Sequence, residues 1–144
     1  MMQQELEQLS QDAADGQADS QYRLAMLYIY GNGVPEDNDL AFGLLQKAAV
    51  QNHIEAKYNL AICYHYGYGT AVDLKKAFSL YLACANAGHG KSMELVGRFY
   101  HRGIYVLRDR ERAKYWLSKA MQSGDIDAIR EAEKEINIQW DCPE

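Results

Sequence analysis

Apolar residues recur every three or four positions along most of the chain, which is the spacing of one face of an α-helix. Residues 54–66 and 73–87 hold two such stripes, each followed by a glycine. Glycine suits the end of a helix because it has no Cβ and adopts the left-handed backbone conformation without a clash. Asp73 stands where its side chain can cap the start of the second helix. The pattern predicts a pair of helices joined by a short loop.

This pair recurs with a fixed step of 36 residues and without gaps. The residues that coincide are Tyr28, Tyr64 and Tyr100; Gly31, Gly67 and Gly103; Asp37, Asp73 and Asp109; and Ala41, Ala77 and Ala113. One such pair cannot bury its apolar face alone, so it stacks on the next pair and shares a core with it. We call the first helix of each pair the A helix and the second the B helix. The sequence therefore predicts an all-α solenoid.

The register predicts eight helices in one repeat domain, residues 1–144. The A helices are expected at residues 18–30, 54–66, 90–102 and 126–138, and the B helices at 37–51, 73–87 and 109–122. A leading B-type helix is expected at 3–15, because Leu9 is in register with Leu45, Tyr81 and Leu117. The predicted parts are the leading helix 3–15, repeats at 18–52, 54–88 and 90–124, and a C-terminal capping helix and tail at 126–144.

Two positions depart from the glycine pattern. Asn52 stands where later repeats have Gly88 and Gly124, and asparagine is the residue that tolerates the left-handed conformation next best. Tyr105 replaces the second loop glycine of the third repeat. We expect that loop to take a different path or to be strained.

The second repeat resembles the Sel1-like repeat, a relative of the tetratricopeptide repeat with a longer, glycine-containing loop. The residues that carry the likeness are Ala56, Leu60, Ala61, Tyr64, Gly67, Gly69, Asp73, Lys76, Ala77, Tyr81, Ala85 and Gly88. The first and third repeats match at most equivalent positions. The resemblance implies a right-handed α/α superhelix that serves as a protein-binding scaffold, and it brings no enzymatic motif.

The composition, with 48% hydrophobic and 24% charged residues, is that of a soluble globular protein. No apolar run approaches the roughly 20 residues of a membrane span, and the acidic start lacks an apolar signal core. The cysteines Cys63, Cys84 and Cys142 are odd in number and lack metal-ligand spacing. Some secreted members of the resembled family carry regular cysteine pairs, which this chain lacks. We expect a cytoplasmic location, reduced thiols and no membrane contact.

Charge is distributed in three bands. Residues 1–60 hold 3 basic and 9 acidic residues, residues 61–122 hold 10 and 4, and residues 123–144 hold 2 and 7. The basic run from Arg108 to Lys114 contains acidic residues and has no interleaved aromatic platform. Because the chain as a whole is acidic, we expect no nucleic-acid partner.

The candidate site lies on the A helices, which line the concave side in the resembled family. With 100° per residue, the residues opposite the core stripe of the first two A helices are aromatic or apolar, where a helix facing only water would be polar. The predicted protein-binding residues are Tyr22, Met26, Ile29, Tyr30, Tyr58, Ile62, His65, Tyr66, Arg98, His101 and Arg102. The last three predict a basic end of the groove and a protein or peptide partner with acidic and apolar segments.

Alternatives stay open at several of these positions. Tyr30 and Tyr66 either pack between neighbouring A helices or stand exposed, whereas we expect exposure for the set Tyr22, Met26, Tyr58 and Ile62. Arg98 and Arg102 are either contacts for a partner or ordinary solvated charges. Near the C-terminus, Ile136, Ile138 and Trp140 either fold back as a cap or form a dimer contact, so the chain is expected to be a monomer or weak dimer.

The chemistry-bearing residues predict no catalysis. The histidines pair by register as His53 with His89 and His65 with His101, but two ligands are too few for a usual zinc site. No nucleophile is matched with a base, and no phosphate or dinucleotide fingerprint is present. We expect no metal, no cofactor and no enzymatic activity, and a role as an adaptor that binds a protein in its groove. The alternatives are an immunity protein that occludes a bacterial toxin and, less favoured, a hydrolase.

Overall fold

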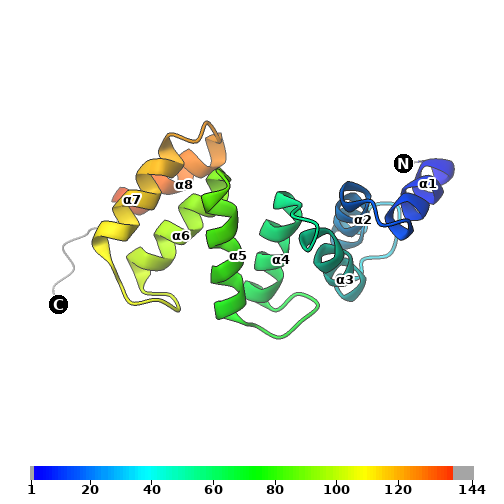
Figure 1. The fold of residues 1–144 in the computed structure, drawn as a ribbon, viewed down its shortest axis with the longest axis horizontal. Helices are drawn as coiled ribbons and strands as arrows, with labels where there is room; N and C mark the ends of the chain where they lie inside the picture. Colours follow the sequence, from blue (N-terminus) through cyan, green and yellow to red (C-terminus); the bar gives the residue numbers. More distant parts are fainter. Residues whose placement is uncertain (1, 138–144) are drawn as a thin grey trace. The chain divides into compact units, whose positions relative to one another are not determined.

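A computed structural model describes residues 2–137, which form eight α-helices and no strand (Figure 1). The helices are α1 (Gln3–Ala14), α2 (Ala18–Tyr30), α3 (Asn38–Ala49), α4 (Ile54–Tyr66), α5 (Leu74–Asn86), α6 (Gly90–Arg102), α7 (Arg110–Met121) and α8 (Ile126–Asn137). The predicted all-α repeat fold is confirmed. Ile138, Trp140 and Cys142 lie outside the described residues.

The start of each B helix is fixed by its aspartate. The side chains of Asp37, Asp73 and Asp109 accept the backbone N–H of the residue three positions on, at 3.0 to 3.1 Å. An N-cap residue stands just outside the helix. The B helices therefore begin one residue later than predicted, at Asn38, Leu74 and Arg110.

The loop between A and B helices is closed in the same way three times. Its first residue, Gly31, Gly67 or Gly103, is left-handed, with φ of 62°, 78° and 66°. The backbone N–H of the capping aspartate then donates to the carbonyl of the repeated tyrosine, at 2.9, 2.8 and 3.0 Å for Tyr28, Tyr64 and Tyr100. These two features reverse the direction of the chain between the A helix and the B helix.

The two departures from the glycine pattern have different outcomes. Asn52 adopts φ of 63°, so it takes the glycine position as predicted. Tyr105 also adopts φ of 63°, in the position where Gly33 and Gly69 have 80° and 71°. The third loop thus keeps a left-handed residue at this position, and the backbone N–H of Val106 donates to the Ile104 carbonyl at 2.6 Å. A tyrosine in this conformation is strained, and packing of its ring against Phe78, with centroids 5.9 Å apart, helps to hold it there.

Two compact units divide the chain inside α5, namely Met1–Ala77 and Phe78–Glu144. We call them unit 1 and unit 2. In unit 1, Leu9, Ala13 and Leu24 form a buried cluster between α1 and α2. Leu9 is 5% exposed, which agrees with the B-type register predicted for the leading helix.

In unit 2, aromatic rings dominate the core. The ring of Phe99 on α6 stacks on Phe78, with centroids 5.7 Å apart, and meets Tyr81 edge-on at 5.8 Å. Gly97 lets α6 approach α7, because a Cβ at this position would lie 2.8 Å from Leu117 Cγ. The small residue at this position therefore permits a close contact between the two helices.

The equivalent loop glycines Gly33 and Gly69 allow the cost of the left-handed conformation to be separated from the cost of close packing. A Cβ on Gly69 would collide with the Asn38 carbonyl oxygen and lie 2.8 Å from Phe42 Cβ, whereas a Cβ on Gly33 meets nothing within 4 Å. Gly33→Ala should lower the free energy of unfolding by about 1 kcal/mol, from left-handed strain alone. Gly69→Ala should cost about 2 kcal/mol more because packing is also disturbed. Urea unfolding of both variants measures this, and equal losses would contradict it.

Candidate protein-binding surfaces

The outward stripes of α2 and α4 form one patterned surface in unit 1. Positions 36 residues apart carry similar side chains in four pairs, namely Asp19 and Glu55, Tyr22 and Tyr58, Met26 and Ile62, and Tyr30 and Tyr66, whereas a fifth pair joins Ile29 with His65. We call these residues the aromatic face. Its N-terminal end is acidic and its C-terminal end is apolar and aromatic.

Exposure along this face differs from what the sequence predicts. Tyr30 and Tyr66 are 73% and 54% exposed, which decides their open alternative in favour of exposure. The set Tyr22, Met26, Tyr58 and Ile62 is only half-buried rather than exposed, so that expectation is wrong. Tyr22 shows one reason, because its ring stacks on His53 with centroids 4.8 Å apart.

A pocket of about 190 Å³ opens at the C-terminal end of the aromatic face. It is lined by Ile29, Tyr30, Asn38, Ala41, Asn59, Ile62, Cys63 and Tyr68. Three of the predicted residues therefore meet there, from α2 and α4. Next to the pocket the ring of Tyr68 stacks on Tyr66 at 5.8 Å, and Tyr66 stacks on His65 at 4.2 Å. The result is an apolar pocket beside a row of partly exposed aromatic rings.

The acidic end of the face is organised by His53. Its Nδ1 accepts the backbone N–H of Ala56 at 3.1 Å, so it caps α4. The same nitrogen cannot also carry a proton, which places the ring proton on Nε2, 3.2 Å from the Asp19 carboxylate. With this tautomer the Nε2–H of His53 donates to the Asp19 carboxylate. The Asp19 side chain is 73% exposed.

The electrostatics at Tyr22 show which groups surround its hydroxyl. Its pKa is raised above the ordinary value, first by burial and then by the Glu55 carboxylate, by Tyr30 when its phenol is ionised, and by the Asp19 carboxylate. Groups from both helices thus act on one point of the surface. Burial likewise raises the pKa of the Cys63 thiol beside the pocket, to about 11, so this cysteine is a poor nucleophile.

In unit 2 the predicted basic residues of α6 are paired with carboxylates. Arg98 donates to Glu94 at 2.6 Å and approaches Glu131 of α8 at 3.5 Å. The Glu135 carboxylate accepts from Arg102 and lies 2.7 Å from His101 Nδ1. These six residues form a network that joins α6 to α8.

This network corrects the predicted basic end of the groove. His101 is 4% exposed, so it is not an open surface contact. Arg98 and Arg102 face three carboxylates, which neutralise their charge. The repeat position of Glu135 is the sequence signal that could have identified this network. Glu135 is equivalent to Leu27, Cys63 and Phe99. An acidic residue at a core position of the repeat indicates a buried partner of opposite charge.

The pKa values of two carboxylates of the network are shifted in opposite directions. The pKa of Glu94 is raised, mainly because burial disfavours its charged form, although Arg98 opposes this. The pKa of Glu131 is lowered, mainly by its hydrogen bond from Lys134. Glu94 is 3% exposed, and its charge is therefore held at a cost to stability.

Several contributing residues were not predicted from the sequence. Asn38, Asn59 and Tyr68 line the pocket, and Asp19 and Glu55 flank the aromatic face. The shared repeat position of Asp19 and Glu55 was an available signal, whereas the pocket depends on side-chain packing. Among residues 2–137 no group of three or more histidine, cysteine, aspartate or glutamate side chains could hold a metal ion. Nor is any helix of this range long and apolar enough to cross a membrane.

The family model of the Sel1 repeat matches residues 18–53, 54–89 and 90–125, and the chain therefore belongs to the Sel1 repeat family. Sel1 repeat proteins are generally protein-interaction scaffolds and are typically non-enzymatic. No curated protein sequence matches the chain.

Solved structures with similar folds are found in bacteria. A Sel1 repeat protein from Oxalobacter formigenes has 32% identity and a TM-score of 0.77, over 90% of this chain and 98% of that one. A protective antigen present in uropathogenic Escherichia coli strains, with an SLR fold, has 27% identity and a TM-score of 0.69, over 85% of this chain and 34% of that one. The Helicobacter pylori cysteine rich protein B shares the fold at 19% identity and a TM-score of 0.70, over 90% and 96%.

Glu135 and Glu133, on the same helix, offer a matched pair for testing the network. Glu135→Ala should lower the free energy of unfolding by about 3 kcal/mol, because it leaves the buried His101 and the nearby arginines without their common acceptor. Glu133→Ala removes an exposed carboxylate and should change it by less than about 0.5 kcal/mol. Chemical denaturation measures both, and equal effects would show that the network contributes nothing.

The raised pKa of Glu94 predicts a pH-dependent effect. An acid with a higher pKa in the folded state stabilises the fold below its unfolded pKa, and this stability is lost as pH rises through the folded pKa. Glu94→Gln cannot ionise and escapes that loss. The stability of the variant relative to the unmodified protein should therefore increase from about pH 4.5 upward. Urea titrations at several pH values measure the difference, and a difference that falls with pH would contradict the assignment.

Proposed function

We propose that this protein is a non-enzymatic adaptor that binds a segment of another protein on the aromatic face of unit 1. The observation that carries the proposal is the pocket lined by Ile29 and Ile62, beside the exposed rings of Tyr30, Tyr66 and Tyr68. Apolar pockets with tyrosine at their rim are typical anchoring points in protein interfaces, because aromatic side chains bury a large area at a small entropic cost.

The charged residues of α6 in unit 2 are paired with one another or with residues of α8. This pairing supports the choice of unit 1 as the site of partner binding. Arg98, His101 and Arg102 already have carboxylate partners within their own unit. A ligand that used them would have to replace these contacts at a cost. The rings of Tyr30 and Tyr66 are largely in contact with water, so covering them with a partner is favourable.

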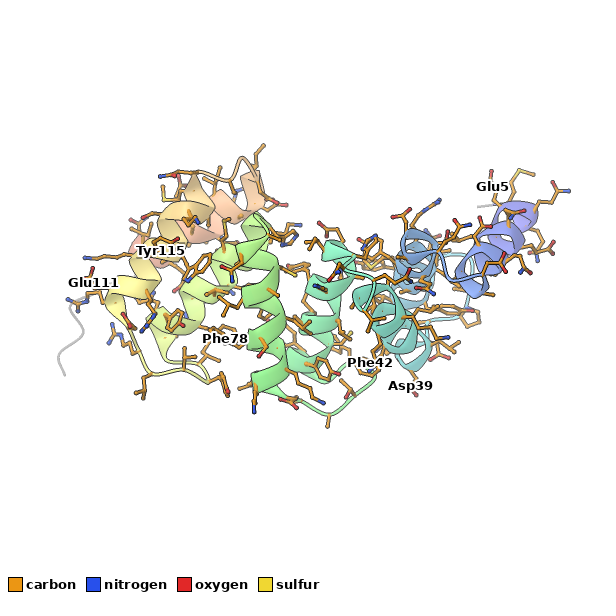
Figure 2. All side chains as sticks on the ribbon, in the orientation of Figure 1. Glu5, Asp39, Phe42, Phe78, Glu111 and Tyr115 are labelled. Atoms are coloured by element: carbon orange, nitrogen blue, oxygen red, sulfur yellow. The ribbon has the colours of Figure 1, made fainter. Side chains whose placement is uncertain are left out.

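Site-specific photo-crosslinking in cells of the source organism tests this proposal. A photoreactive phenylalanine analogue at Tyr30 or Tyr66 should give crosslinked adducts with a discrete partner. The same analogue at Tyr115 is the control, because Tyr115 is 56% exposed, close to the 54% of Tyr66, but lies on α7 of unit 2 (Figure 2).

Ile62→Gln should suppress the adducts at Tyr66 at least fivefold, because it places a polar group in the pocket, equivalent to about 1 kcal/mol or more. Tyr68→Ser is a second variant, which changes a side chain that is 48% exposed and leaves the core intact. Thermal unfolding confirms that both variants are folded. Adducts that are equally strong at Tyr115, or unaffected by either variant, would contradict the proposed site.

A further inference from the structure

We propose that two copies of this chain associate through the outward face of α3, antiparallel across a twofold axis at Gly43, with Asp39 of each copy paired with Lys47 of the other. This surface lies in unit 1 but is separate from the aromatic face. Ala41, which lines the pocket of that face, lies about 160° around α3 from Gly43, at roughly 100° per residue. The dimer therefore leaves the proposed partner site open.

The first argument is the glycine in the middle of α3. Glycine destabilises a helix interior relative to alanine, because it loses more backbone freedom on folding. At Gly97 of α6 close packing explains the glycine, since a Cβ there would lie 2.8 Å from Leu117 Cγ, whereas a Cβ on Gly43 meets nothing within 4 Å. No packing contact within residues 2–137 therefore requires a glycine at position 43. A second helix that approaches α3 closely at this point would require one.

The second argument is the apolar character of this face. Leu40 and Val50 are 51% and 82% exposed. The equivalent residues of α5 and α7 are polar or charged, namely Lys76, Asn86, Arg112 and Gln122. A groove of about 270 Å³ lies beside the face, and Asp39, Gly43 and Lys47 are among the residues that line it. Covering exposed apolar side chains next to such a hollow is favourable.

The third argument is the symmetry of the charges about Gly43. Asp39 precedes Gly43 by four residues and Lys47 follows it by four, so each lies about 6 Å from Gly43 along the helix. A twofold axis at Gly43 reverses the second helix and places Asp39 of each copy beside Lys47 of the other. Both side chains are exposed, and neither takes part in a hydrogen bond or ion pair within residues 2–137. The face is therefore complementary in charge to a second copy of itself, as a twofold dimer requires.

The charges and the glycine carry different weight in this argument. An aspartate in the first turn and a lysine in the last turn stabilise α3 by themselves, so they alone do not indicate a partner. Gly43 does not stabilise the helix, and it is the residue that an intermolecular contact explains. The charges then identify the occupant, because their equal spacing on either side of Gly43 suits the same helix in reverse.

Sedimentation velocity of the full chain from about 5 to 500 µM tests the association. A contact made by one helix face of each copy lies at the small end of protein interfaces, so monomer and dimer should exchange within this range. Gly43→Gln should weaken the dimer about tenfold or more, because its side chain occupies the point where the two helices meet. The folded monomer has room for it, since the surface is open there. A chain that stays monomeric throughout, or a dimer that Gly43→Gln leaves unchanged, would overturn the inference.

Charge exchange at the two ends of the face tests the twofold pairing. Asp39→Lys places two lysines together in each contact and Lys47→Asp places two aspartates together, so each variant alone should dimerise about tenfold more weakly. In an equimolar mixture of the two variants every contact again joins opposite charges, and a heterodimer should form. The double variant Asp39→Lys, Lys47→Asp should dimerise with itself for the same reason. Circular dichroism confirms that the variants are folded, and failure of either sample to recover would contradict the antiparallel pairing.

The matched control exchanges charge at the equivalent positions of α7, as Glu111→Lys and Lys119→Asp (Figure 2). Both residues are exposed, and Tyr115 stands between them where α3 has Gly43. Each control variant should dimerise within about twofold of the unmodified protein. Weakening as large as that in the α3 variants would overturn the inference, because it would reflect net charge rather than this face.

Ile62→Gln separates this inference from the proposed function. It changes the pocket of the aromatic face and should leave the dimer unchanged. A dimer that Ile62→Gln dissociates would place the second copy on the aromatic face and overturn the inference.

Discussion

The whole fold depends on reversing the chain after each A helix within a few residues. A left-handed residue ends the helix, and the amide of the next capping aspartate returns to the carbonyl of the repeated tyrosine. Because these groups are backbone atoms near a helix end, they would otherwise remain without partners. The loop therefore satisfies its own hydrogen bonds and sets where the B helix begins. Everything that faces outward from the A helices is positioned by this reversal.

The repeated backbone does not constrain the residue type at the outward positions of the A helices. The two units carry different residues there. In unit 1 the equivalent positions carry Tyr22 and Tyr58, which are half-buried and contribute to an apolar face. In unit 2 the same position is Glu94, which is buried against Arg98. The first choice leaves a surface for a partner, and the second is satisfied within the unit. One backbone thus supports both an interaction surface and an internal ionic contact.

The fold could be predicted from the sequence almost completely, because its determinants are local and repeated. Helix ends need glycine or aspartate at fixed positions, and both recur every 36 residues. The predictions from the sequence were wrong where a side chain contacts residues of another helix. His101 and Arg98 were read as surface groups, since their partner Glu135 lies more than thirty residues away in sequence.

The histidines illustrate why register alone does not assign chemistry. His53 and His89 share a repeat position, and the sequence predicts a surface role for them rather than a metal site. Each instead accepts a backbone amide at the start of an A helix, at 3.1 and 3.3 Å. At the next equivalent position, Asp125 accepts the amide of Ala128 at 3.0 Å. A carboxylate and an imidazole are interchangeable here because the position needs only a hydrogen-bond acceptor. In unit 1 the ring of this ordinary cap also lies 3.2 Å from the Asp19 carboxylate, so a structural requirement of the repeat helps to position an acidic group on the proposed binding face.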